Sequence, residues 1–188
     1  KTSRMKKFYH FLLKMLGWTI EGGCPEGNKF IIIQAPHTSL WDFVYGWLFS
    51  RAIGIKPKFL IKSKYFFWPL GPILKMLGGV AVYPSKDTRF VKHLVQQIHS
   101  SKNFILVITP EGTRKKVKRW KTGFYQISLE TGLPILLGRI DYSNKFIHLG
   151  NVFYPTGNME ADLRKIQGYF RASWAKHPER YYEWPPTD

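Results

Sequence analysis

The sequence has little cysteine and no long apolar run, and each absence excludes a class of protein. Its single cysteine, Cys24, excludes an internal disulfide and any zinc site built from cysteines, and favours a reducing compartment. A transmembrane helix needs about 20 mostly apolar residues. The nearest candidate, residues 65–83, is interrupted by prolines, glycines and a lysine. The basic N-terminal stretch also lacks the apolar core and small-residue cleavage site of a signal peptide.

Acidic residues are scarce as well. Against 29 Lys and Arg there are only 12 Asp and Glu, which gives a formal net charge of +17. Such a surplus predicts an anionic partner, which can be nucleic acid, an anionic membrane surface or a phosphorylated small molecule. With 188 residues, 44% of them hydrophobic, the chain is long and apolar enough for one folded domain with a sizeable core.

Apolar periodicity predicts an α/β fold with a single domain. Strands alternate with helices along most of the chain, which favours a mixed, mostly parallel sheet flanked by helices. The last two strands form a hairpin, and this hairpin makes the sheet mixed. The expected strands cover 30–34, 58–62, 80–83, 104–108, 135–140 and 145–152. The expected helices cover 4–20, 39–51, 70–77, 123–130 and 159–170. A further helix, capped by Asp87, is expected from an apolar stripe over 90–98.

The first helix, expected over residues 4–20, is amphipathic and basic. Met5, Phe8 and Leu12 share one face, while Lys7 and Lys14 lie on the other. A basic amphipathic helix at a terminus is typical of a membrane interface, although an ordinary helix packed on its own domain has the same pattern. We therefore divide the chain into a membrane-docking helix over 1–22 and a globular domain over 23–188.

A histidine and an aspartate follow the first apolar strand in "IIIQAPHTSLWD". In open α/β sheets, ligands bind beyond the carboxyl ends of the strands, where His37 lies. Asp42 can orient the imidazole of His37 and leave its second ring nitrogen free as a general base. The same spacing also fits a structural turn in which Asp42 is the negative charge at a helix N-terminus. Because no G-x-S-x-G motif is present, a base here would act on a hydroxyl group of a substrate.

A second motif, "TPEGTRKK", follows the strand over 104–108. Gly112 lets the backbone approach a ligand closely, and the planar guanidinium of Arg114 suits a phosphate or carboxylate. Six of the twelve residues from 110 to 121 are Lys or Arg. A run of this kind is often only a solvated face, but here it follows a strand end, where anions commonly bind.

The two motifs in this order resemble the glycerolipid acyltransferases, typified by lysophosphatidic acid acyltransferase. The resemblance extends from about residue 30 to 140, including "GLPILLGRI", and implies that 23–188 is an acyltransferase domain. It implies that His37 is the general base for the acceptor hydroxyl and that Asp42 orients this histidine. The activated oxygen then attacks the thioester of acyl-CoA or acyl-carrier protein without an acyl-enzyme, and no metal or other cofactor is expected.

The resemblance also implies the partners. Glu111, Gly112, Thr113 and Arg114 bind the acceptor, a lysolipid such as 1-acylglycerol-3-phosphate, with the arginine on its phosphate. The enzyme is expected at the cytoplasmic face of the membrane as a peripheral protein of phospholipid biosynthesis that binds anionic lipid. The aromatic run over 65–68 lines an acyl channel, lies in the membrane interface or packs in the core.

The sequence departs from the family pattern at two places, which leaves alternatives open. Pro36 stands where the family has asparagine, and Tyr83 and Pro84 stand where its second block has Asp and Arg. Lys86 or Arg89 can take the place of that arginine. The alternatives are an acyltransferase for an acceptor without phosphate and a non-catalytic basic module that binds anionic lipid or nucleic acid. Nucleic acid is not expected, because the cations are scattered and no recognised nucleic-acid motif is present.

Overall fold

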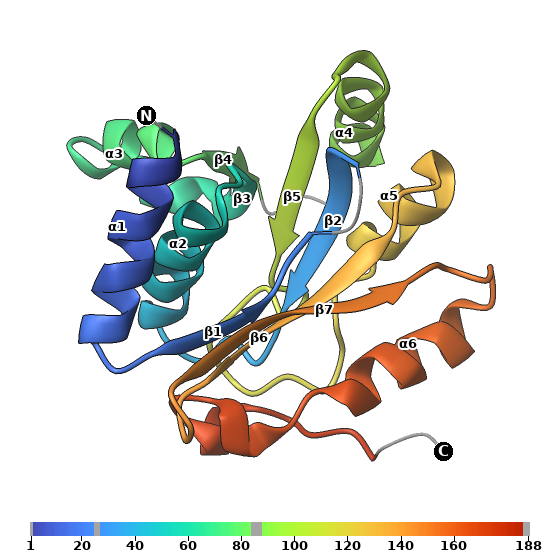
Figure 1. The fold of residues 1–188 in the computed structure, drawn as a ribbon. Helices are drawn as coiled ribbons and strands as arrows, with labels where there is room; N and C mark the ends of the chain where they lie inside the picture. Colours follow the sequence, from blue (N-terminus) through green and yellow to red (C-terminus); the bar gives the residue numbers. More distant parts are fainter. Residues whose placement is uncertain (1, 25–26, 84–87, 186–188) are drawn as a thin grey trace.

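One mixed sheet forms the centre of the protein in a computed structural model that describes residues 2–24, 27–83 and 88–185 (Figure 1). Its strand order is β1-β7-β6-β2-β5-β3-β4. The strands are β1 (Thr19–Gly22), β2 (Lys29–Gln34), β3 (Lys58–Lys62), β4 (Gly79–Val82), β5 (Phe104–Ile108), β6 (Ile135–Asp141) and β7 (Phe146–Phe153). The helices are α1 (Thr2–Met15), α2 (Trp41–Ile53), α3 (Leu70–Met76), α4 (Thr88–Ser100), α5 (Gly123–Thr131) and α6 (Met159–Tyr169), and short 3₁₀ turns cover η1 (Ser63–Tyr65), η2 (Ala172–Trp174) and η3 (Pro178–Arg180).

The direction of the strands confirms the predicted fold class. β6, β2, β5, β3 and β4 run parallel to one another, while β7 is antiparallel to β6 and β1 is parallel to β7. The sheet is therefore mixed and mostly parallel, and the expected hairpin joins β6 to β7. The six predicted strands and the five helices after the first are present within one or two residues of their expected bounds. The predicted cap Asp87 lies outside the described residues.

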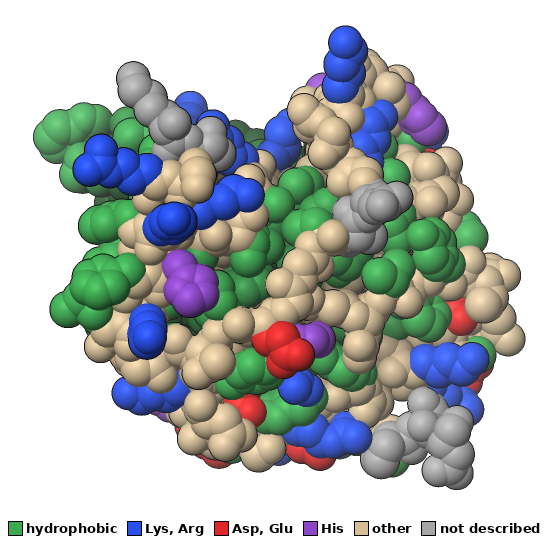
Figure 2. Space-filling model, in the orientation of Figure 1, with side chains coloured by type: hydrophobic (Ala, Val, Ile, Leu, Met, Phe, Trp, Pro, Cys, Tyr) green, Lys and Arg blue, Asp and Glu red, His purple; other side chains and the backbone are tan. Residues whose placement is uncertain are grey.

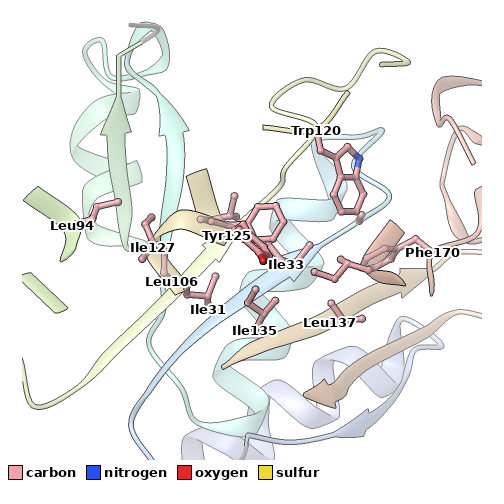
Figure 3. Packing of buried hydrophobic residues seen from close by; sticks show 14 of the residues in the cluster. Ile31, Ile33, Leu94, Leu106, Trp120, Tyr125, Ile127, Ile135, Leu137 and Phe170 are labelled. Atoms are coloured by element: carbon pink, nitrogen blue, oxygen red, sulfur yellow. The ribbon is translucent and has the colours of Figure 1, made fainter. Parts of the chain in front are cut away.

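The central strand β2 has buried side chains on both faces of the sheet. Phe30 and Ile32 belong to a cluster that includes residues of α1 and α2. Ile31 and Ile33 point the other way, into a cluster with residues of α4, α5 and α6 (Figure 3). Because successive side chains alternate between faces, a strand covered by helices on both sides must be apolar throughout. This double burial fixes the end of β2, and with it the start of the loop that carries His37.

The predicted first helix over 4–20 is too long by five residues. α1 ends at Met15, and the backbone reverses at Gly17, whose φ of 79° lies in a region that glycine adopts without steric cost. Trp18 is then buried, and Thr19–Gly22 pair with β7 as an edge strand. Of the apolar residues after position 15, Trp18 and Ile20 therefore pack in the core beside the sheet, while Leu16 lies in the turn and is half exposed. No helix of the described ranges is long and apolar enough to cross a membrane.

Candidate active site

The two motifs meet because their strands are neighbours. β2 and β5 pair in parallel, so that Ile33 lies opposite Ile108 and the loops that follow both strands leave the same edge of the sheet (Figure 1). One loop carries His37 and leads into α2; the other carries Glu111 to Arg114 and leads towards α5. The carboxyl edge of a parallel sheet is where ligands of α/β proteins bind.

His37 and Asp42 form a hydrogen-bonded pair, as their spacing predicts. The distance from Nδ1 of His37 to Oδ2 of Asp42 is 3.1 Å. The same Oδ2 accepts hydrogen bonds from the main-chain N–H groups of Thr38 and Ser39, both at 2.9 Å. The Asp42 side chain is 1% exposed and that of His37 is 18% exposed. With its proton on Nδ1, His37 keeps the lone pair of Nε2 for a group in the adjoining cavity, which the histidine lines.

Asp42 has a further partner that sequence reasoning missed. The hydroxyl of Tyr142, at the start of the β6–β7 turn, donates to Oδ1 of Asp42 at 2.7 Å. These two residues are 100 positions apart in the chain. No local pattern around Tyr142 indicates this role. The only available signal is the order of the strands, because β6 lies beside β2 and delivers its carboxyl end to the same edge.

Glu111 contacts the main chain of His37. Its Oε1 accepts the main-chain N–H of His37 at 2.9 Å, and the residue is 5% exposed. Burial raises the pKa of the Glu111 carboxyl to about 8, the negative charge of Asp42 adds to this effect, and the hydrogen bond from His37 opposes it. Glu111 therefore connects the second motif to the backbone of the first.

The other members of the second motif, Gly112, Thr113 and Arg114, line the cavity. Nη2 of Arg114 donates to the hydroxyl of Tyr65 at 3.3 Å, which leaves the rest of the guanidinium for a ligand. Gly112 has a φ of 62°, and a Cβ at this position would lie 2.9 Å from Cε of Lys121. Glycine is favoured here for its backbone conformation, while the end of the flexible lysine side chain could move aside for a Cβ.

Basic side chains from three segments line the part of the cavity around Arg114. Lys86, predicted to contribute here, lies outside the described residues, and so does the side chain of Arg89, whose backbone is in the first turn of α4. The end of β3 and η1 instead supply lysines that sequence reasoning did not select. The basic residues of this wall are Lys62, Lys64, Arg114, Lys115, Lys116 and Lys121. Their summed charge makes this end of the cavity suitable for a phosphate group.

The cavity has a volume of about 1590 Å³ and continues from His37 into an apolar arm. This arm runs between α2, β3 and α3, where Phe43 and Phe59 meet edge to face with ring centroids 5.1 Å apart. Gly46 of α2 lines it, and a Cβ at this glycine would find no heavy atom within 4 Å. The apolar walls of the arm consist of Phe43, Phe49, Phe59, Ile61, Leu70, Ile73, Leu74 and Leu77. A small polar end and a long apolar end fit an amphiphilic ligand.

The structure bears on three residues of the aromatic run over 65–68. Tyr65 lines the cavity, whereas Phe67 is 58% and Trp68 is 85% exposed. A core role is therefore wrong for these last two. Within the described ranges there is no group of three or more His, Cys, Asp or Glu side chains that could hold a metal ion.

Comparison with known proteins adds family and fold. Residues 20–136 match the model of the protein family described as Acyltransferase. A 1-acyl-sn-glycerol-3-phosphate acyltransferase of Cocos nucifera is 32% identical over 141 residues, which is 68% of this chain but 44% of the relative, so that this chain spans less than half of it. The crystal structure of the 1-acyl-sn-glycerophosphate (LPA) acyltransferase PlsC from Thermotoga maritima has the same fold, with a TM-score of 0.60 and 22% identity over 87% of this chain and 73% of that chain.

Proposed function

The chain belongs to the acyltransferase family, as its two motifs predict, and from this membership we propose that it transfers a fatty acyl group from a thioester to a hydroxyl group of a lysolipid. The observation that carries the proposal is the His37–Asp42 pair, 3.1 Å apart at the polar end of a cavity whose other end is apolar. The pair supplies a base, and the cavity fits an amphiphilic acceptor.

His37 acts as the general base. Its Nε2 takes the proton of the acceptor hydroxyl as the oxygen attacks the carbonyl carbon of the thioester, and the resulting tetrahedral species loses its thiolate as the C–S bond breaks. The thiolate takes the proton back from His37. Asp42 stabilises the imidazolium between these two steps through its hydrogen bond to Nδ1. The donor is acyl-CoA or acyl-carrier protein, both of which offer the same thioester, and the reaction needs no further cofactor.

The acceptor carries a phosphate, as 1-acylglycerol-3-phosphate does. The second block of the family pattern provides an arginine where this chain has Tyr83 and Pro84, so the charge must come from elsewhere. The basic wall supports this role, because Lys62 and Lys64 line the same cavity as Arg114. A phosphate-free acceptor would leave these cations without a partner in the cavity.

The protein works at an anionic membrane surface, as a peripheral protein of the cytoplasmic face. α1 exposes apolar side chains such as Phe8, at 55%, and the segment around α3 exposes Trp68 and Met76. Hydrophobic and basic side chains are interleaved over this part of the molecule (Figure 2). Apolar groups that enter the headgroup region and cations that meet anionic lipid are together typical of interfacial binding. The surface made by α1 and α3, called the docking surface below, comprises Met5, Phe8, Phe11, Met15, Phe67, Trp68, Ile73 and Met76.

A mass-spectrometric screen of lysolipids with acyl-CoA and with acyl-carrier protein tests the proposal. We expect the wild type to acylate a phosphate-bearing lysolipid and His37→Ala to lose about 10²–10⁴-fold in rate, the usual contribution of a general base. His93→Ala, which removes an exposed histidine of α4, is the matched control and keeps the wild-type rate. Normal turnover by His37→Ala would refute the mechanism. Vesicle binding without turnover of any acceptor would instead favour a non-catalytic lipid-binding module.

A further inference from the structure

Tyr142 lies outside residues 20–136, the segment that matches the family, yet its hydroxyl contacts the acidic member of the catalytic pair. We propose that Tyr142 is a positioning residue that holds the Asp42 carboxylate in the orientation in which it supports His37. The inference rests on the proposed function for its consequence in catalysis. The arrangement of the Tyr142, Asp42 and His37 side chains does not depend on that function.

The hydrogen-bond donors around Asp42 are divided between its two carboxylate oxygens. Oδ2 accepts from Nδ1 of His37 and from the N–H groups of Thr38 and Ser39. Oδ1 accepts from the Tyr142 hydroxyl at 2.7 Å. The terminal torsion of an aspartate side chain has a broad energy profile, so contacts at one oxygen fix the carboxylate plane poorly. A donor at the second oxygen fixes this plane and, with it, the direction of Oδ2 towards His37.

Tyr142 is itself held firmly. Asp141 forms the turn that follows β6, because its Oδ1 accepts the N–H groups of Ser143 and Asn144 at 3.0 and 3.1 Å. The N–H of Tyr142 donates to the main-chain carbonyl of Trp174, at 2.9 Å. Its ring meets that of Trp18 edge to face, with centroids 5.2 Å apart. A side chain restrained at its backbone and at its ring can impose a position on the group that its hydroxyl contacts.

The hydroxyl remains a donor throughout the working range of pH. Burial, and then the negative charge of Asp42, raise the pKa of Tyr142 well above its usual value. The titratable groups that face Tyr142 and Asp42 are His37 in the same loop, Glu111 from the second motif and Tyr45 from α2. From the C-terminal segment, Lys176 places its Nζ 5.9 Å from the centre of the Tyr142 ring.

Tyr142→Phe tests the inference, with Tyr45→Phe as the matched control. Both variants remove one hydroxyl from the same aromatic group, in which the rings of Tyr45 and Tyr142 both contact Trp18. The hydrogen bonds of the described residues give Asp42 a donor from Tyr142 and none from Tyr45. Two measurements are made for each variant: the pH dependence of kcat and kcat/KM, and the titration of His37 by NMR of its ring nitrogens.

We expect Tyr142→Phe to lower kcat about tenfold with little change in KM, the order of one hydrogen bond to a charged group. The acidic limb of the pH profile and the NMR titration of His37 both move to lower pH, because a carboxylate that turns away from Nδ1 stabilises the imidazolium less. Tyr45→Phe is expected to match the wild type in both measurements. A tyrosine that merely packs would lower the melting temperature without moving the titration of His37.

The inference is overturned if folded Tyr142→Phe keeps the wild-type kcat and His37 titration, or if Tyr45→Phe changes both equally. The NMR titration needs no turnover, and circular dichroism reports whether each variant is folded. If the wild type acylates no acceptor, the proposed function fails, while the titration of His37 still decides the role of Tyr142. The two failures can therefore be told apart.

Discussion

The main-chain N–H of His37 donates a hydrogen bond to Oε1 of Glu111, 74 residues away in the chain and 2.9 Å away in space. The loop that carries His37 and the loop that carries Glu111 are thus joined by a contact that does not involve the imidazole. A glutamate at the start of the second motif positions the first motif.

Glu111 should make stability depend on pH. The folded protein holds the Glu111 proton up to a pKa of about 8, whereas an unfolded chain releases it near the usual glutamate pKa of about 4.5. The folded state therefore binds more protons in this window, and the free energy of unfolding falls as the pH rises from about 4.5 to about 8. The contribution of this group is of the order of 3–5 kcal/mol.

Denaturant unfolding at pH 5, 6.5 and 8 measures this effect. Glu111→Gln keeps an amide oxygen for the N–H of His37 but cannot titrate, so its stability should fall less with pH than that of the wild type. Glu130→Gln, at an exposed position near the end of α5, controls for the loss of one carboxylate. Equal pH slopes for the wild type and Glu111→Gln would contradict the raised pKa.

Arg114 should determine affinity for the acceptor phosphate. Arg114→Lys keeps the charge but loses the planar fork that can bind two oxygens at once, so we expect KM for 1-acylglycerol-3-phosphate to rise about tenfold. The KM for a monoacylglycerol without phosphate should stay the same. Arg164→Lys, on the exposed face of α6, serves as the control. An equal rise in KM for both acceptors would argue against a phosphate contact.

Gly46 should limit how long an acyl chain fits the apolar arm. A leucine at this position projects into space that is open in the wild type. Gly46→Leu should therefore lower kcat/KM for long acyl chains, by about 0.8 kcal/mol for each methylene group excluded, and spare short ones. Gly46→Ala is the control, because it adds one methyl group and suits a helix better than glycine does. A preference profile that is unchanged in Gly46→Leu would locate the acyl chain elsewhere.

The docking surface should bind vesicles that contain anionic lipid. Phe8→Glu and Trp68→Glu each place a charge among exposed apolar side chains and should weaken flotation with such vesicles about 10- to 100-fold, since burial of one large apolar side chain is worth about 1.5–3 kcal/mol. Tyr154→Glu changes an aromatic residue of similar exposure, 64%, outside this surface and should bind normally. Equal loss in all three variants would indicate a nonspecific effect of charge.

Local chemistry explains why much of this arrangement could be predicted. The apolar run of β2 ends at Gln34, so a loop at the strand end is predictable there. The contact of His37 with Asp42 was one of two interpretations of their spacing, beside a structural turn, and the distance of 3.1 Å confirms the contact. The predicted end of the first helix, at residue 20, is wrong because the spacing of apolar residues continues past Gly17, whereas the backbone changes direction at this glycine. Periodicity does not detect such a change of direction.

The contacts that could not be predicted depend on which strands become neighbours in the sheet. Tyr142 reaches Asp42 because β6 lies next to β2, and Lys62 joins the basic wall because β3 lies next to β5. Nothing within ten residues of either side chain encodes these contacts. Glu111 shows the same limit in another way: its presence in the motif was predictable, but its contact with the backbone of His37 was not.

The position of β2 also determines when this site can exist during synthesis. β2 pairs with β5 and β6, both of which are translated after it. Asp42 accepts a hydrogen bond from a tyrosine that lies 100 residues downstream. At 5–20 residues per second, a ribosome needs about 5–20 s to cover that distance. For this time the nascent chain carries His37 and Asp42 without the hydrogen bond from Tyr142. The contacts around Asp42 are therefore complete only after β6 and Tyr142 have been made.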